Sequence, residues 1–223
     1  MNHTLIRKKQ EDVNNLLNRK RLYESISMLR ELARETQKGE LIDTLYNIEM
    51  TYKSLLRFTV EGFTDPERQK IYNHILADIF GVADEIFMQL FIRYGQGVFF
   101  DLMRQHAGIG RESLESILVQ CRTEMDRTEL MESVPVPHSE VFNSAFRQLF
   151  EITLTQKGLY KENEDIIINC FRESSLPWAQ QCVLVSAVTI HLLHFFNEDA
   201  ILLLFKLTTH TNAEIRQRAL VGL

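Results

Sequence analysis

The tripeptide Asn163-Glu164-Asp165 recurs at an offset of 34 as Asn197-Glu198-Asp199. At the same offset Phe171-Arg172 is matched by Phe205-Lys206, and at an offset of 36 the next helical stripe pairs Ala179, Val183 and Leu184 with Ile215, Ala219 and Leu220. Self-similarity at about 34–36 residues, with two helices in each unit, is typical of helical repeat proteins. We therefore predict an all-α protein, an α-solenoid in which antiparallel helix pairs form a right-handed superhelix. An irregular multi-helix bundle is the alternative.

The second of these units ends in a recognisable pattern. Residues 212–223 read Asn-Ala-Glu-Ile-Arg-Gln-Arg-Ala-Leu-Val-Gly-Leu, which resembles the start of the second helix of a HEAT repeat. Asn212, Ile215, Arg216, Ala219 and Leu223 match that pattern. Ala213 stands where proline is common, Gly222 where alanine is common, and the preceding unit has Gln180 in place of the arginine. The resemblance implies that Asn212 and Arg216 are structural residues that link adjacent repeats.

Residues 138–223 are accordingly predicted to hold HEAT-like repeats. The chain stops about eleven residues into a helix whose motif has just begun, and a solenoid needs a polar terminal unit. We therefore expect the repeats to continue in a longer native protein, or a partner to cover the end.

The amino-terminal part, residues 1–133, is predicted to form helical hairpins. Apolar stripes at helical spacing end near Gly39 and near the glycines 95 and 97, because glycine readily adopts the left-handed conformation that ends a helix. Asp65 and Pro66 mark a helix start. The segment Ser133-Val134-Pro135-Val136-Pro137 separates the two parts, since residues before proline are driven out of the α region.

The charge balance argues against a nucleic-acid-binding function for the whole chain. Among 223 residues, 25 are basic and 30 are acidic, a formal net charge of −5 with a pI near 5.8. Residues 1–60 carry eleven basic and eight acidic side chains, a local excess of three positive charges that includes Arg19-Lys20-Arg21. That excess is the only support for binding to a duplex.

No membrane-spanning or secretory segment is expected. The most apolar stretch, residues 182–196, is about 15 residues long and contains two histidines, whereas a spanning helix needs about 20 residues. The three cysteines, Cys121, Cys170 and Cys182, are too few and too widely spaced for a disulfide framework. They fit reduced, buried thiols in a cytoplasmic protein.

The sequence contains no motif that carries a known chemistry, and we predict neither catalytic residues nor a cofactor. The best metal candidates are His191 and His194, which share a helix face at a spacing of three residues. Their neighbours are apolar and their helix carries no carboxylate, so buried structural histidines are the preferred interpretation. A bound metal at this pair stays an open question.

A scaffold function follows from the predicted architecture by analogy alone. We expect a non-catalytic helical-repeat protein that binds a protein partner or another segment of its own longer chain. Trp178, at the start of a helix, is the candidate partner contact. A nucleic-acid-binding repeat protein and an enzyme with a site between helices are the alternatives. Binding that weakens steeply with salt would favour the first alternative, and bound metal in the purified protein would favour the second.

Overall fold

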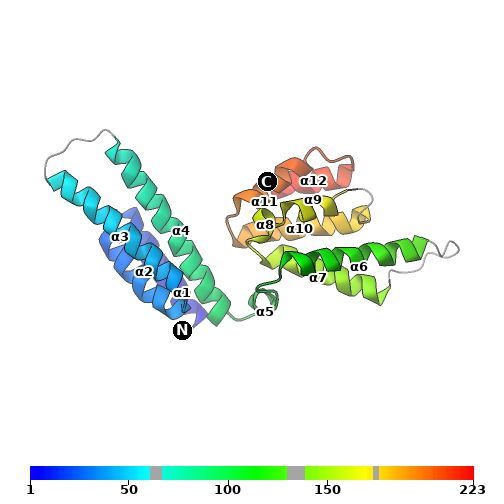
Figure 1. Cartoon of the computed structure of the whole chain (residues 1–223), viewed down its shortest axis with the longest axis horizontal. Helices are drawn as coiled ribbons and strands as arrows, with labels where there is room; N and C mark the ends of the chain where they lie inside the picture. Colours follow the sequence, from blue (N-terminus) through cyan, green and yellow to red (C-terminus); the bar gives the residue numbers. More distant parts are fainter. Residues whose placement is uncertain (61–66, 130–138, 173–175) are drawn as a thin grey trace. The chain divides into compact units, whose positions relative to one another are not determined.

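The structure is a computed structural model that describes residues 1–60, 67–129, 139–172 and 176–223. Within these ranges there are twelve α-helices and no β-strand (Figure 1). The helices are α1 His3–Asn18, α2 Leu22–Thr36, α3 Gly39–Val60, α4 Arg68–Tyr94, α5 Val98–Gln105, α6 Arg111–Glu129, α7 Glu140–Thr155, α8 Leu159–Glu162, α9 Glu164–Cys170, α10 Trp178–His194, α11 Glu198–Leu207 and α12 Ala213–Gly222. The all-α prediction is confirmed.

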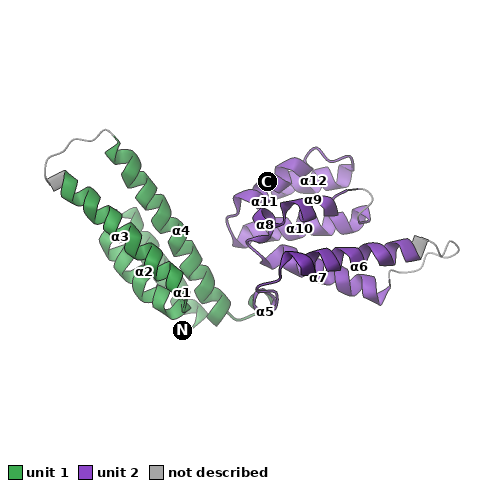
Figure 2. Cartoon of the chain, in the orientation of Figure 1, with its two compact units in different colours: residues 1–101 green, residues 102–223 purple. Residues whose placement is uncertain are grey.

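The chain divides into two compact units, residues 1–101 and residues 102–223 (Figure 2). Each unit has its own hydrophobic core. The boundary predicted from the prolines at 135 and 137 lies outside the described residues. The helices on either side of it, α6 and α7, pack against each other within the second unit.

The first unit consists of α1–α4 and the first half of α5. Tight turns join α1 to α2 and α2 to α3, each with one residue in the left-handed conformation, Lys20 (φ 59°) and Gln37 (φ 61°). We predicted a helix stop at Gly39. The structure instead places the left-handed residue at Gln37, and Gly39 becomes the first residue of α3. The predicted hairpin of these two segments is present, because α2 packs on α3.

Helix α4 provides the centre of this unit, because it contacts α1, α2 and α3. Its buried residues follow the helical spacing read from the sequence: Ile75, Ile79, Ala83, Ile86 and Leu90. Gly81 does not interrupt the helix, and Gly95 follows its last residue as predicted. A side chain at Gly95 would meet the Phe91 carbonyl oxygen and lie 2.7 Å from Cγ of Phe100, so only glycine fits there. The predicted cap at Asp65 and Pro66 lies outside the described residues.

The helices α6 to α12 of the second unit surround one core. Helix α6 packs on α7, and α11 packs on α12. Helix α10 contacts both α7 and α12. The short helices α8 and α9 contact α11 and α6, respectively, and each other. Residues 138–223, which were predicted to hold HEAT-like repeats, contain the helices α7 to α12, and α8 is the shortest of them.

The repeat spacing of 34 coincides with helix starts. Asn163 is the residue before α9 and Asn197 the residue before α11. The offset of 36 in the following helices is wrong: it pairs exposed Val183 with buried Ala219, and buried Leu184 with exposed Leu220. Two residues turn a helix by about 200°, which exchanges its faces. An offset of 34 pairs buried residues with buried residues, Gln181 with Ile215 and Val185 with Ala219.

Candidate functional site

His191 is fully buried in α10 and both of its ring nitrogens are engaged. Nδ1 lies 3.1 Å from the Leu154 carbonyl oxygen, which can only accept, so Nδ1 carries the proton. Nε2 then accepts from Nδ2 of Asn197 at 3.2 Å. The pKa of His191 is lowered to about 4, mainly by burial and to a smaller extent by the nearby His194 and Lys157, while the bond to Leu154 acts in the opposite direction. His191 is therefore a neutral structural histidine.

Asn197 completes this network from the start of α11. Its Oδ1 accepts from the amide of Ala200, which caps the helix, and its Nδ2 donates to the Lys157 carbonyl oxygen at 2.9 Å. One buried amide thus ties α11 to α10 and to the turn between α7 and α8.

His194 does not join His191 at a common site. It lies on the exposed side of α10, whereas His191 points into the core. Among the described residues no group of three or more His, Cys, Asp or Glu side chains is arranged to hold a metal ion. The two candidate histidines thus lie in different surroundings, and the buried structural role preferred for them fits His191.

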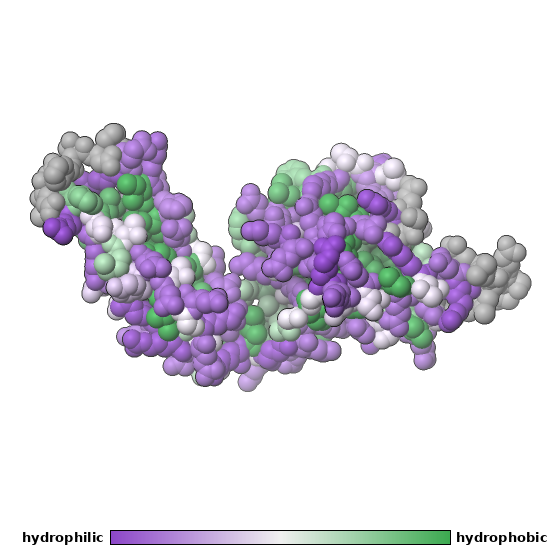
Figure 3. All heavy atoms as spheres, in the orientation of Figure 1, coloured by the Kyte–Doolittle hydropathy of each residue, from purple (hydrophilic) through white to green (hydrophobic). Residues whose placement is uncertain are grey.

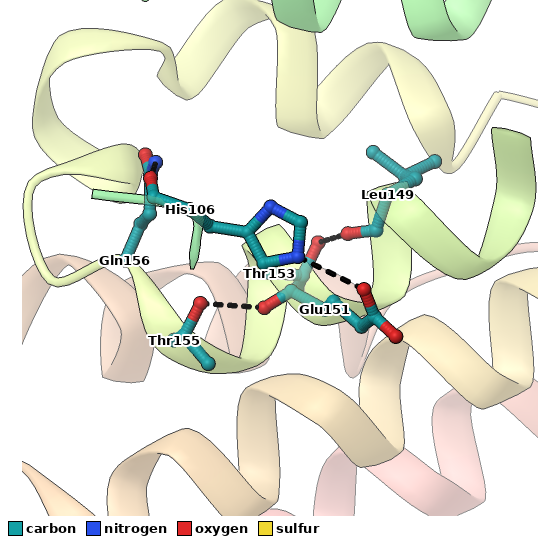
Figure 4. A network of polar contacts seen from close by, with 6 residues as sticks. All are labelled: His106, Leu149, Glu151, Thr153, Thr155 and Gln156. Carbon is teal, nitrogen blue, oxygen red and sulfur yellow. Dashed lines mark hydrogen bonds and ion pairs between the residues drawn. The ribbon is translucent and has the colours of Figure 1, made fainter. Parts of the chain in front are cut away.

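A second buried histidine, His106, was not singled out from the sequence. Its Nε2 lies 2.9 Å from Oε2 of Glu151 in α7, and its carbonyl oxygen accepts from the side chain of Gln156 (Figure 4). The hydroxyls of Thr153 and Thr155 donate to carbonyl oxygens one turn earlier in the same helix. The contacts of His106 hold the segment after α5 against the end of α7. We find no feature of this network that requires a ligand.

The three cysteines are free and buried, as predicted. Burial raises the pKa of the Cys121 thiol to about 11 and that of Cys170 to about 12. Thiolates are the reactive form of cysteine, so neither side chain is suited to nucleophilic chemistry near neutral pH.

Asn212 and Arg216 both stabilise the turn before α12. Oδ1 of Asn212 accepts from the amide of Glu214 at 2.9 Å, and Nη1 of Arg216 donates to the carbonyl oxygens of His210 and Thr211 at 2.7 Å each. These bonds lie within one helix pair. The predicted role of both residues in linking adjacent repeats stays a prediction.

His210 makes a bond between successive parts of this unit. Its Nε2 lies 2.7 Å from the carbonyl oxygen of Phe171, which connects the turn between α11 and α12 to the end of α9.

Trp178 is the first residue of α10 and is 56% exposed. Its indole is therefore accessible to a partner, although a contact with one stays a prediction. The basic run Arg19-Lys20-Arg21 forms the exposed turn between α1 and α2, and Arg21 pairs with Glu24.

The sequence did not predict a set of exposed apolar side chains on α11 and α12. They are Leu202 and Phe205 of α11, Leu220 and Val221 of α12, and Leu223. Figure 3 shows hydrophobic surface on the second unit close to the point where Figure 1 marks the C-terminus. Helical spacing alone predicts that Leu220 is a core residue. Applying the repeat period of 34 to the second helix of each pair, as well as to the first, could have corrected this prediction.

Comparison with family models, with curated proteins and with solved structures finds no match for this chain. The resemblance to a HEAT repeat therefore depends on residues 212–223 themselves. Within the described ranges no helix has both the length and the apolar character that crossing a membrane requires.

Proposed function

We propose that residues 102–223 form a HEAT-like α-solenoid of three helix pairs and that the protein is a non-catalytic scaffold for protein–protein interaction. The pairs are α6–α7, α8/α9–α10 and α11–α12.

The order of helix contacts supports this architecture. The first helices of successive pairs contact each other, α6 with α9 and α8 with α11, and so do the second helices, α7 with α10 and α10 with α12. This is the arrangement expected when each unit buries its apolar face on its neighbours.

Ion pairs between the first helices of successive pairs also support this architecture. Arg111 of α6 binds Asp165 of α9, with a 3.0 Å bond from Nη1 to Oδ1, and Lys206 of α11 pairs with Glu164 of α9. The bonds between Arg111 and Asp165 raise the pKa of the guanidinium and lower the pKa of the carboxyl. Because both side chains are exposed, the ion pair adds little stability. The two ion pairs indicate which helices are neighbours.

One observation carries the functional proposal: positions that are covered in the middle pair are open in the last pair. Phe171 is 4% exposed, whereas its equivalent at an offset of 34, Phe205, is 57% exposed. Ser186 and Thr189 of α10 lie against α12, and their equivalents Leu220 and Leu223 are 61% and 49% exposed. In α11–α12, apolar side chains thus occupy positions whose equivalents in the preceding pair are covered or contact the next helices.

Such a surface favours a binding partner made of protein. Contiguous exposed apolar residues mark interaction sites, and an apolar surface offers nothing to a phosphate backbone, which is held by cations. We therefore place the partner on the second unit and not on the basic turn at residues 19–21.

Site-specific photo-crosslinking tests the proposed function. A benzophenone amino acid is introduced singly at Trp178, Phe205 and Leu220, all exposed, with exposed Lys8 of α1 as the control. In cells that naturally make the protein, we expect the three sites on the second unit to yield the same protein adduct and the control to yield none. The adduct must then bind the purified chain, with affinity reduced by Phe205→Glu.

Two results would count against a protein scaffold. One is the absence of a protein adduct from every site. The other is purified chain that binds a short duplex with an affinity that falls steeply between 50 and 200 mM salt, roughly 10³-fold or more for a protein with many phosphate contacts.

A further inference from the structure

We infer that the surface shared by α2 and α3, in the first unit, binds an acidic amphipathic helix of a partner protein. The inference goes beyond the proposed function, which concerns the second unit. We call this surface the α2–α3 face. It consists of eight residues, of which Arg30 is half-buried and the others are exposed: Tyr23, Ser27, Arg30 and Arg34 of α2, and Tyr46, Met50, Lys53 and Arg57 of α3.

Helix α2 carries its basic and acidic side chains on different sides. The four α2 residues of the face recur at spacings of four, three and four, which aligns them along the helix. Arg30 pairs with Glu49 of α3, so this side borders α3. The glutamates at 24, 31 and 35 each follow a residue of the face, about 100° further round the helix. Tyr94 of α4 donates to Oε2 of Glu35 at 3.4 Å, so the acidic side borders α4.

Helix α3 repeats the spacing of four, three and four, and a buried carboxylate holds two of the cations in place. Glu49 is 6% exposed. It pairs with Arg30 across the two helices and with Nζ of Lys53 at 2.7 Å on its own helix. Among the described residues, no side chain pairs with Arg34. The face thus carries four basic side chains against one carboxylate, an excess of three positive charges in a chain whose net charge is −5.

This arrangement favours an acidic helix as the ligand. The cations form two pairs, Arg30 with Arg34 and Lys53 with Arg57, each spaced by four residues, about 6 Å along the helix axis. Carboxylates four residues apart on a helix have the same spacing, and opposite charge fixes the register of such a contact. The ligand also needs an apolar side, because two tyrosines and a methionine of the face are each about half exposed: Tyr23, Tyr46 and Met50.

The surroundings of the face favour a protein over a nucleic acid or an anionic membrane. Four cations are few beside the roughly 6–10 phosphate contacts of a typical duplex-binding protein. Carboxylates also border the face on both helices, Glu31 and Glu35 on α2 and Asp43 on α3, and all three residues are exposed. Asp43 lies two turns before Met50, on the same side of α3. An extended polyanion or a flat anionic surface would meet these acids, whereas a single helix about 10 Å wide can lie between them.

A labelled helical peptide of about 18 residues is the probe. It carries Glu at every fourth position on one side and Leu on the adjacent side, and a peptide of the same composition in shuffled order is its control. Fluorescence anisotropy with the full chain measures affinity. We expect saturable binding of the first peptide only. Arg34→Glu and Tyr46→Ala should each weaken it about fivefold or more, because a lost ion pair alone contributes up to about fivefold.

Two further variants fix the sign of the charge effect. Asp43→Asn removes the bordering carboxylate and should tighten binding about twofold. Lys8→Glu reverses an exposed cation of α1, away from the face, and should change affinity less than about twofold. Circular dichroism confirms that each variant stays folded. Peptide affinity that is indifferent to both Arg34→Glu and Tyr46→Ala overturns the inference.

Competing occupants of the face are tested on the same protein. A single-stranded oligonucleotide or phosphatidylserine vesicles that bind the chain through Arg34, while the peptide does not, would overturn the inference. A benzophenone amino acid at exposed Ser27 then reports what lies on the face in cells. A crosslink within the same chain overturns it, and a crosslink to an acidic helix that the peptide displaces supports it. Crosslinks from the second unit do not enter this test, so the proposed function and this inference can fail separately.

Discussion

Replacing Asn197 with alanine is expected to lower the free energy of unfolding of residues 102–223 by about 3 kcal/mol. The loss has two sources. Removal of a helix cap costs about 1 kcal/mol, and the amide of Ala200 loses its acceptor. In addition, Nε2 of buried His191 loses its donor, at about 1–3 kcal/mol for a buried group left without a partner. The carbonyl oxygen of Lys157 loses a donor as well, but Lys157 is exposed and water can replace that bond. The unfolding midpoint of this unit should fall by about 10 °C.

The matched control is Asn163→Ala, at the equivalent position one repeat earlier. Asn163 is also buried before a helix, but no described residue donates to its Oδ1 and it makes no side-chain cap bond. We expect this substitution to change stability by less than about 1 kcal/mol, within the range of a weak cap. Calorimetry of the full chain, with hydrogen exchange in α10 and α11 to identify the transition, makes the comparison. Equal losses from the two substitutions would show that the Asn197 network does not stabilise the unit.

The second large effect is a dependence of stability on pH that comes from His191. Its pKa is about 4 in the folded protein, against 6.5 for an unperturbed histidine. Below pH 6.5 the unfolded chain therefore binds a proton that the folded chain does not. The contribution of the neutral imidazole is complete above pH 6.5, declines as the pH falls towards 4, and is fully lost below that. A difference of about 2.5 pH units corresponds to about 3 kcal/mol.

Denaturant unfolding between pH 7.5 and pH 4 measures this effect. Carboxylates titrate in the same range. The quantity to compare is therefore the change with pH in the free energy of unfolding of His191→Gln, minus the same change in the unaltered chain. We expect the variant to lose about 2–3 kcal/mol less over this range. His74→Gln on α4 is the control, because His74 is 81% exposed and should leave the curve unchanged. Parallel curves for His191→Gln and the unaltered chain would show that His191 binds a proton as readily in the folded chain as in the unfolded chain.

The sequence predicted the helices well because their signals are local. Apolar spacing identified the buried positions of α4 from Ile75 to Leu90, and Gly95 marked its end. The Asn-Glu-Asp repeat located the starts of α9 and α11. Each of these features depends on a few neighbouring residues, which is the range over which propensity and capping act.

Features that depend on neighbours distant in the chain were harder to predict. The spacing of His191 and His194 is compatible with a metal site, and only the packing of Leu154 and Asn197 around His191 shows that its nitrogens are engaged. Leu220 has the spacing of a core residue, yet it is exposed because no helix of the described chain covers that side of α12. His106 carries no local signal for its contact with Glu151, 45 residues away.

The equivalence of the last two helix pairs at an offset of 34 is the central claim about this chain. Appending a copy of residues 190–223 after Leu223 tests it, because the copy places a second Asn197 at an offset of 34 residues from the first. The measurement is hydrogen exchange of the appended segment, read together with the thermal midpoint of the second unit.

If the pairs stack with this period, the appended helices will be protected and the midpoint will rise by several degrees, because each added repeat contributes a new interface. Phe205→Glu with Leu220→Glu in the original pair should abolish both changes. Appended amides that exchange as fast as those of an unfolded peptide, with the midpoint unaltered, would contradict the account.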